Sequence, residues 1–124
     1  MALKKAFITA RYDDPDGNLG NRWKDGSTEI VLKPKDPPSA GTWDTTRGSD
    51  IDSGGGTEHA TYVWDHVNHA VVLTVGGYEG DTSNKTVARL ARFNDYKVGA
   101  KGDGYFVFRG KNVPITWELT VMEY

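Results

Sequence analysis

The sequence predicts an all-β fold: a jelly-roll-like antiparallel β-sandwich of seven or eight short strands, with a closed β-barrel as the alternative. Two observations carry this prediction. Segments rich in β-branched and aromatic residues recur along the chain, separated by glycine, proline, aspartate and asparagine turn signals. No segment combines the length and the capping residues of a convincing helix. Many short strands with turns between them are typical of sandwiches and barrels.

The overall composition indicates one domain spanning residues 1–124. Hydrophobic residues make up 37% of the chain, and the 15 glycines bring it into the range of globular proteins. The formal charge is −2, from 15 basic and 17 acidic residues that are mixed along the sequence, so no broad basic field is expected. Cysteine is absent, and the fold must therefore be stabilised without disulfides.

Three strands are expected in the first part of the chain. Leu3–Tyr12 is rich in β formers and stops at the turn residues Asp13–Asn18. Thr28–Lys33 forms the second strand, which a proline closes. Residues 34–56 contain few aliphatic side chains and predict a long loop, of a kind that is often functional, which a short strand around Thr42–Thr45 could divide.

The clearest local pattern is a β-hairpin in the middle of the chain. Two β-forming runs, His59–Asp65 and His69–Gly76, flank the short polar link His66-Val67-Asn68, and glycines follow on both outer sides. We expect this hairpin to have a structural role and to position the loops that lie beyond its glycines.

Three further strands are expected towards the C-terminus, namely Thr86–Asn94, Gly104–Arg109 and Ile115–Glu123. The last has the cleanest alternation of the chain. Its apolar members are predicted to point inward and its polar members outward: Ile115, Trp117, Leu119 and Val121 against Thr116, Glu118 and Thr120.

The three histidines, His59, His66 and His69, raise the question of a metal site. Zinc needs three or four converging ligands, and spaced motifs such as HExxH are missing. The spacing favours ordinary turn and surface histidines, with no metal and no cofactor. Asp13–Asn18 resembles the start of a calcium loop, but Leu19 stands where an EF-hand requires glycine. A simple turn is the preferred interpretation there, and a looser calcium site is the alternative.

Motifs for catalysis are also missing. Serine nucleophile elbows, P-loops and dinucleotide-binding fingerprints are absent, and cysteine chemistry is excluded. The prediction is a protein that is not an enzyme. The N-terminal residues read as a strand rather than a signal peptide, and no apolar run reaches the ~20 residues of a membrane span. We therefore expect a soluble protein that is cytoplasmic or released without a signal peptide.

Two local resemblances suggest other partners. Arg92-Phe93-Asn94 followed by Lys101–Phe108 resembles the RNP-type pattern of cold-shock and related RNA-binding domains, in which exposed aromatic residues stack on bases. Asp103 departs from that pattern, and the near-zero net charge disfavours nucleic acid. Gly54–His59, leading into Ala70–Thr74, resembles part of the chagasin-type cysteine-protease inhibitors, which are disulfide-free β-sandwiches. That resemblance implies a protein partner.

The leading hypothesis comes from aromatic residues in polar, glycine-rich segments. Sugars are recognised by an aromatic ring together with a few placed polar groups. The sequence therefore predicts a small carbohydrate-binding, lectin-like protein that binds a carbohydrate or glycoconjugate and forms homo-oligomers to raise avidity. The rival is a protein-interaction module, either a protease inhibitor or a structural subunit of a larger assembly such as a virion. The predicted ligand-binding residues are Trp43, Asp44, Arg47, Tyr78, Asp81 and Trp23.

Overall fold

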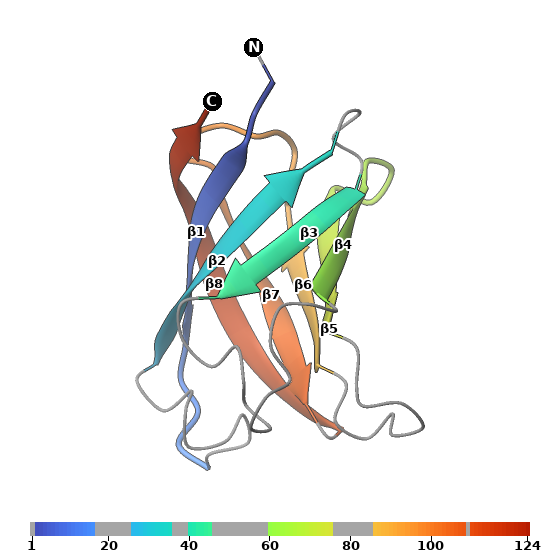
Figure 1. Cartoon of the computed structure of the whole chain (residues 1–124). Coiled ribbons are helices and arrows are strands. Elements are labelled where there is room, and N and C mark those ends of the chain that lie inside the picture. Colours follow the sequence, from blue (N-terminus) through green and yellow to red (C-terminus); the bar gives the residue numbers. More distant parts are fainter. Residues whose placement is uncertain (1, 17–25, 36–39, 46–59, 76–85, 109) are drawn as a thin grey trace.

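The computed structural model describes residues 2–16, 26–35, 40–45, 60–75, 86–108 and 110–124, and these form eight strands and no helix. The strands follow one another in the order of the sequence (Figure 1). They are β1 (Lys5–Tyr12), β2 (Ser27–Pro34), β3 (Ala40–Thr45), β4 (Ala60–Asp65), β5 (Ala70–Val75), β6 (Thr86–Ala91), β7 (Lys101–Phe108) and β8 (Lys111–Glu123).

The eight strands form one closed antiparallel barrel in which each strand pairs with its neighbours in the chain. Closure comes from β1 and β8, which pair from Lys5↔Glu123 to Tyr12↔Ile115. The predicted all-β fold is confirmed, and the closed barrel, the alternative to the sandwich, is the observed architecture. Pairing the first strand with the last removes the two outer edges that an open sheet of these strands would expose.

The expected strands are confirmed, with differences of a few residues at their ends. The largest differences, of three or four residues, are at the end of β6 and at the starts of β7 and β8, which begin before the expected Gly104 and Ile115. A Cβ atom at Gly104 would meet the backbone carbonyl of Arg89 on β6. The glycine that was expected to mark a strand boundary instead permits close approach of two paired strands.

The core fills the inside of the barrel. An eight-stranded barrel is just wide enough for side chains from all strands to meet at its centre. Alternate residues of each strand point inward, and the largest fully buried side chains include Trp117, Tyr62, Phe93, Phe106, Ile8, Ile30, Leu32, Leu73, Leu90 and Leu119.

The alternation predicted for β8 is confirmed up to Thr120 and is wrong at Val121. Trp117 and Leu119 are buried, whereas Val121 is 51% exposed. The pairing with β1 shifts between Phe7 and Ile8, where Leu119 pairs with Ile8 but Val121 pairs with Phe7. Thr120 is therefore an extra residue in a β-bulge, and it reverses the direction of the side chains that follow.

The two ends of the barrel differ in what the strands connect to. At the upper end in Figure 1 lie both termini, the β4–β5 turn and the link between β6 and β7. At the lower end β1, β3, β5 and β7 finish, and β2, β4, β6 and β8 begin.

An aromatic cluster closes the upper end, and we call Trp64, Phe93, Tyr96 and Trp117 the aromatic plug. The Phe93 ring stacks on Trp117 with centroids 5.1 Å apart, and Trp64 meets both Phe93 and Tyr96 edge to face. The predicted strand Thr86–Asn94 ends early, at Ala91. Arg92 has a positive φ of 63°, which turns the chain so that Phe93 enters the barrel end instead of continuing the strand.

Candidate functional site

A hollow of about 360 Å³ lies against β1, β7, β8 and the start of the β6–β7 link. Its volume falls in the range of about 300–1,000 Å³ that is usual for small-ligand sites. We call it the β7–β8 groove. Its lining residues are Arg11, Arg92, Lys101, Gly102, Asp103, Thr116, Trp117 and Glu118.

Strand register explains why charged side chains gather in this groove. Thr116 on β8 has Arg11 of β1 opposite it on one side and Asp103 of β7 on the other. Two residues further along β8, Glu118 lies opposite Lys101. Residues that alternate along paired strands share one face, so these five side chains all lie on the outside of the barrel, where they are exposed.

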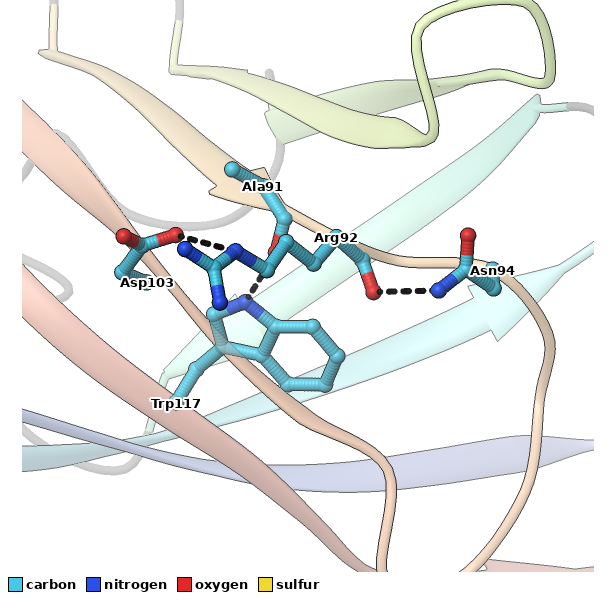
Figure 2. Close-up of polar contacts among 5 residues, drawn as sticks. All are labelled: Ala91, Arg92, Asn94, Asp103 and Trp117. Carbon is cyan, nitrogen blue, oxygen red and sulfur yellow. Dashed lines mark hydrogen bonds and ion pairs between the residues drawn. The ribbon is translucent and has the colours of Figure 1, made fainter.

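Beneath these charged groups, Gly102 and Trp117 provide a firm wall. The Trp117 indole is buried, and its Nε1–H donates a hydrogen bond to the Ala91 carbonyl oxygen at 2.8 Å (Figure 2). A Cβ atom at Gly102 would lie 2.8 Å from that Nε1, which is too close for any side chain without a shift. Glycine at this position therefore lets the indole nitrogen reach the edge of β6.

Arg92 reaches from the β6–β7 link to the same surface. Figure 2 shows its guanidinium pointing to Asp103, with Nε 3.6 Å from Oδ1. The two side chains are 75% and 56% exposed, so solvent screens the pair and its contribution to stability is small. The Asn94 side-chain amide donates to the Arg92 carbonyl oxygen at 3.3 Å and holds the turn that presents the guanidinium.

Trp43, one of the predicted ligand-binding residues, lies inside the barrel. It sits on β3, opposite Leu32 of β2, and only 4% of its surface is exposed. The aromatic ring was expected in a polar loop, but the strand around Thr42–Thr45 places it among core side chains. Its Nε1 is buried and has no hydrogen-bond partner among the described residues. Asp44, the next residue, belongs to β3 and pairs with Val31.

The remaining predicted ligand-binding residues lie outside the described part of the chain. They are Trp23, Arg47, Tyr78 and Asp81. The strand ends that flank their segments are described, and all of them lie at the lower end of the barrel (Figure 1). The topology thus brings the six strand ends that flank these segments to one end of the barrel.

The histidine turn at the upper end is held by Asp65. Its Oδ1 accepts hydrogen bonds from the backbone N–H groups of Val67 and Asn68, and Asn68 Nδ2 donates to Oδ2 at 2.6 Å. These hydrogen bonds, the one from the Asn68 side chain above all, lower the pKa of the Asp65 carboxyl. His66 and His69 are exposed, and His66 packs its ring against Trp64 with centroids 3.9 Å apart.

No metal centre is evident in the ranges that the structure covers. There, no three His, Asp or Glu side chains come together in a way that could hold an ion. His59, and Gly17 and Asn18 of the proposed calcium loop, fall outside these ranges.

The RNP-type segment places its aromatic residues on opposite faces of β7. Phe106 is buried in the barrel and packs edge to face against Tyr12, with centroids 5.8 Å apart. Tyr105 lies on the outside and is half-buried. Of the chagasin-like segments, Gly54–His59 lies outside the described residues, and Ala70–Thr74 belongs to β5.

Sequence reasoning did not single out the groove, because its residues come from three strands. In the sequence, Lys101 and Asp103 belong to the RNP-type pattern, and Arg11 is one residue of the expected strand Leu3–Tyr12. The sequence does hold one signal, the alternation along the last strand. It correctly predicts that Thr116 and Glu118 face outward, but it does not identify the strands on either side of β8. Identifying those neighbours required knowing that the barrel closes between β1 and β8.

Comparisons with protein-family models, curated proteins and solved structures find no match to this chain. Within the described ranges, no helix has the length and apolar character needed to cross a membrane.

Proposed function

We propose that the protein is a non-enzymatic carbohydrate-binding protein and that its ligand lies in the β7–β8 groove. One observation carries the proposal: a hollow of ligand size is lined by closely spaced hydrogen-bond donors and acceptors on rigid strands. Arg11, Arg92 and Lys101 donate, Asp103 and Glu118 accept, and Thr116 can do both.

This mixture of groups matches the chemistry of a sugar. Each hydroxyl of a sugar is both a donor and an acceptor, so an array of alternating cations, carboxylates and a threonine hydroxyl can satisfy several neighbouring hydroxyls. The Trp117 Nε1–H is already bonded to Ala91, so the indole supports the wall of the groove rather than competing for the ligand. Support of this kind keeps the binding groups in fixed positions.

The surroundings of the two carboxylates favour binding over hydrolysis. Glycoside hydrolases need one carboxylic acid whose pKa is raised, usually by burial in an apolar pocket. Asp103 is 56% exposed and faces Arg92, and Glu118 is exposed opposite Lys101. Neither carboxylate therefore lies in a buried apolar pocket of that kind.

A shallow site of this kind binds weakly, and we propose that homo-oligomers raise its avidity. The middle of the outer face of β4 and β5 is suited to such a contact, because it carries four uncharged, β-branched side chains: Thr61, Val63, Val72 and Thr74. Val63 is 58% exposed. In a two-fold dimer this patch packs against the same patch of the second subunit. A charged face would oppose such packing, because like charges would repel each other. Light scattering should show an oligomer that Val63→Lys dissociates.

A second candidate, a protein-interaction module, is favoured by the apolar side chains exposed at the upper end. Val67, at the tip of the β4–β5 turn, is 85% exposed, and Val98 in the β6–β7 link is 55% exposed. Binding of a papain-like protease that is lost on replacing both valines with serine, without any sugar binding, would favour this candidate.

A glycan array tests the carbohydrate proposal directly. The wild-type chain should bind at least one glycan, and Asp103→Asn with Glu118→Gln should lose that binding because two acceptors become weaker and partly donating. Glu123→Gln is the matched control, since Glu123 is an exposed carboxylate on β8 outside the groove. No bound glycan at high protein concentration, with and without calcium, would contradict the proposal.

A further inference from the structure

We infer that the sugar bound in the β7–β8 groove carries a carboxylate, and that Arg11 binds this group. The inference rests on the proposed function and names its ligand class. It starts from the charges of the groove: the lining has three cationic side chains and two anionic ones. This local excess of positive charge contrasts with the formal charge of −2 for the whole chain.

Four of the five charges have a charge of opposite sign beside them. Arg92 contacts Asp103, with Nε 3.6 Å from Oδ1. Lys101 lies directly opposite Glu118 across the β7–β8 pair, where Cβ atoms are about 4.5–5.5 Å apart. Once these two neighbouring pairs are set aside, Arg11 is the remaining charged side chain of the groove lining.

Among the described residues, Arg11 is the cation of the groove that has no carboxylate directly opposite it. Its cross-strand neighbours are Ser27 on β2 and Thr116 on β8, and neither carries a charge. No described carboxylate forms an ion pair with the Arg11 guanidinium. The side chain is exposed on the outer wall, so its donors are accessible to a ligand.

The chemistry of a guanidinium selects the group that it binds. Arginine presents a planar fork of N–H donors that fits a carboxylate through two parallel hydrogen bonds. Thr116, opposite Arg11, offers a hydroxyl donor to the same ligand group. On the far side of Thr116, Asp103 provides acceptors for sugar hydroxyls. A ring that carries one carboxylate and several hydroxyls, such as a hexuronic acid, matches this order of groups across three strands.

The test compares two sugars that differ in one group. Methyl β-D-glucuronide and methyl β-D-glucoside are titrated into the full chain, and binding is followed by calorimetry at low and at moderate salt. We expect the glucuronide to bind about tenfold more tightly or better, as expected for one hydrogen-bonded charge pair, and its advantage to shrink as salt rises.

Variants of Arg11 assign that advantage to one side chain. Arg11→Gln should lower glucuronide affinity about tenfold and leave glucoside affinity unchanged, whereas Arg11→Lys, which keeps the charge but not the fork, should fall between the two. Lys111→Gln removes an exposed cation of β8 outside the groove and should change neither affinity. Circular dichroism of each variant verifies that the barrel is intact.

The outcomes separate the inference from the proposed function. If the glucoside binds as tightly as the glucuronide, or if Arg11→Gln keeps the preference, the carboxylate assignment is overturned and the carbohydrate site stands. If the glucuronide does not bind but neutral glycans on the array do, the inference alone fails. If no sugar of either kind binds, the proposed function fails with it.

Discussion

The buried tryptophans at the two ends of the barrel interior differ in the hydrogen bonding of their indole N–H groups. At the upper end, Trp64 Nε1–H donates to the Phe93 carbonyl oxygen at 3.1 Å, and Trp117 Nε1–H donates to the Ala91 carbonyl oxygen at 2.8 Å. Two residues before the lower end of β3, Trp43 is also buried, but its Nε1 has no hydrogen-bond partner in the described part of the chain.

The difference originates in the β6–β7 link. Residues 92–100 bring their own aromatic side chains into the barrel, and the backbone at the start of this link supplies an acceptor for Trp64. The Phe93 N–H in turn donates to the His69 carbonyl oxygen at 2.8 Å, which ties the plug to the β4–β5 turn. Polar groups at this end are buried but matched, and a matched network makes a rigid frame. The groove is built against this frame.

The largest effect that tests this comparison is removal of the centre of the plug. Phe93→Ala deletes a fully buried ring that contacts Trp64, Tyr96 and Trp117, and it should lower the free energy of unfolding by about 3–5 kcal/mol. Urea denaturation measures this change. Val98→Ala, in the same link but 55% exposed, should alter stability by no more than about 0.5 kcal/mol. Similar effects for both variants would show that the link does not contribute to the core.

An intermediate effect separates the tryptophans. Replacing Trp64 or Trp117 with phenylalanine leaves a buried carbonyl without its donor, which adds about 1–3 kcal/mol to the cost of the smaller ring. Trp43→Phe removes a donor that has no partner, so it should cost less than either by about 1 kcal/mol or more. Three denaturation curves decide the matter, and an equal or larger cost for Trp43→Phe would mean that Nε1 has a partner in solution.

A smaller effect concerns two tyrosines at the plug, Tyr62 and Tyr96, whose hydroxyl oxygens lie 2.9 Å apart. Burial raises the pKa of both phenols above their usual value near 10, and at Tyr96 the hydrogen bond to Tyr62 raises it further. The unfolded chain then loses these protons at a lower pH than the folded chain does. The stabilisation is present below pH ~10 and is lost as pH rises beyond it.

The measurement is the free energy of unfolding between pH 8 and pH 11, compared between wild type and a variant with both Tyr62→Phe and Tyr96→Phe. The free energy of unfolding of the variant should fall less than that of wild type over this range. The two phenol protons, which the folded chain retains to higher pH than the unfolded chain, are absent from the variant. Tyr124→Phe, at the exposed C-terminal end, should follow the wild-type curve. Identical slopes for wild type and the double variant would contradict the burial of these hydroxyls.

Much of the fold could be predicted from the sequence, because strand patterns are local. The β4–β5 hairpin and the inward face of Ile115, Trp117 and Leu119 follow from alternation and turn residues alone. Closure could not be predicted, since it depends on the pairing of β1 with β8 across the length of the chain. The bulge at Thr120 also has no local signal in the sequence, and it turns the Val121 side chain outward instead of inward.

The candidate site was harder to predict for the same reason. The polar residues around Trp43 in the sequence predict an exposed, ligand-binding side chain. Its burial depends instead on which face of β3 the side chain points to, and this is the inner face. The groove joins Arg11 to Asp103 through Thr116, residues separated by most of the sequence. Its charges become a site only after three strands are aligned.

The most direct test of the account is to locate the bound ligand by backbone amide NMR. Methyl β-D-glucuronide is titrated into labelled protein, and shifts are followed for every assigned amide. If the sugar binds in the β7–β8 groove, the largest shifts fall on residues 101–103 and 116–118 and on Arg11. Large shifts confined to the strand ends at the lower end of the barrel, such as Thr45 and Ala60, would place the ligand elsewhere and contradict it.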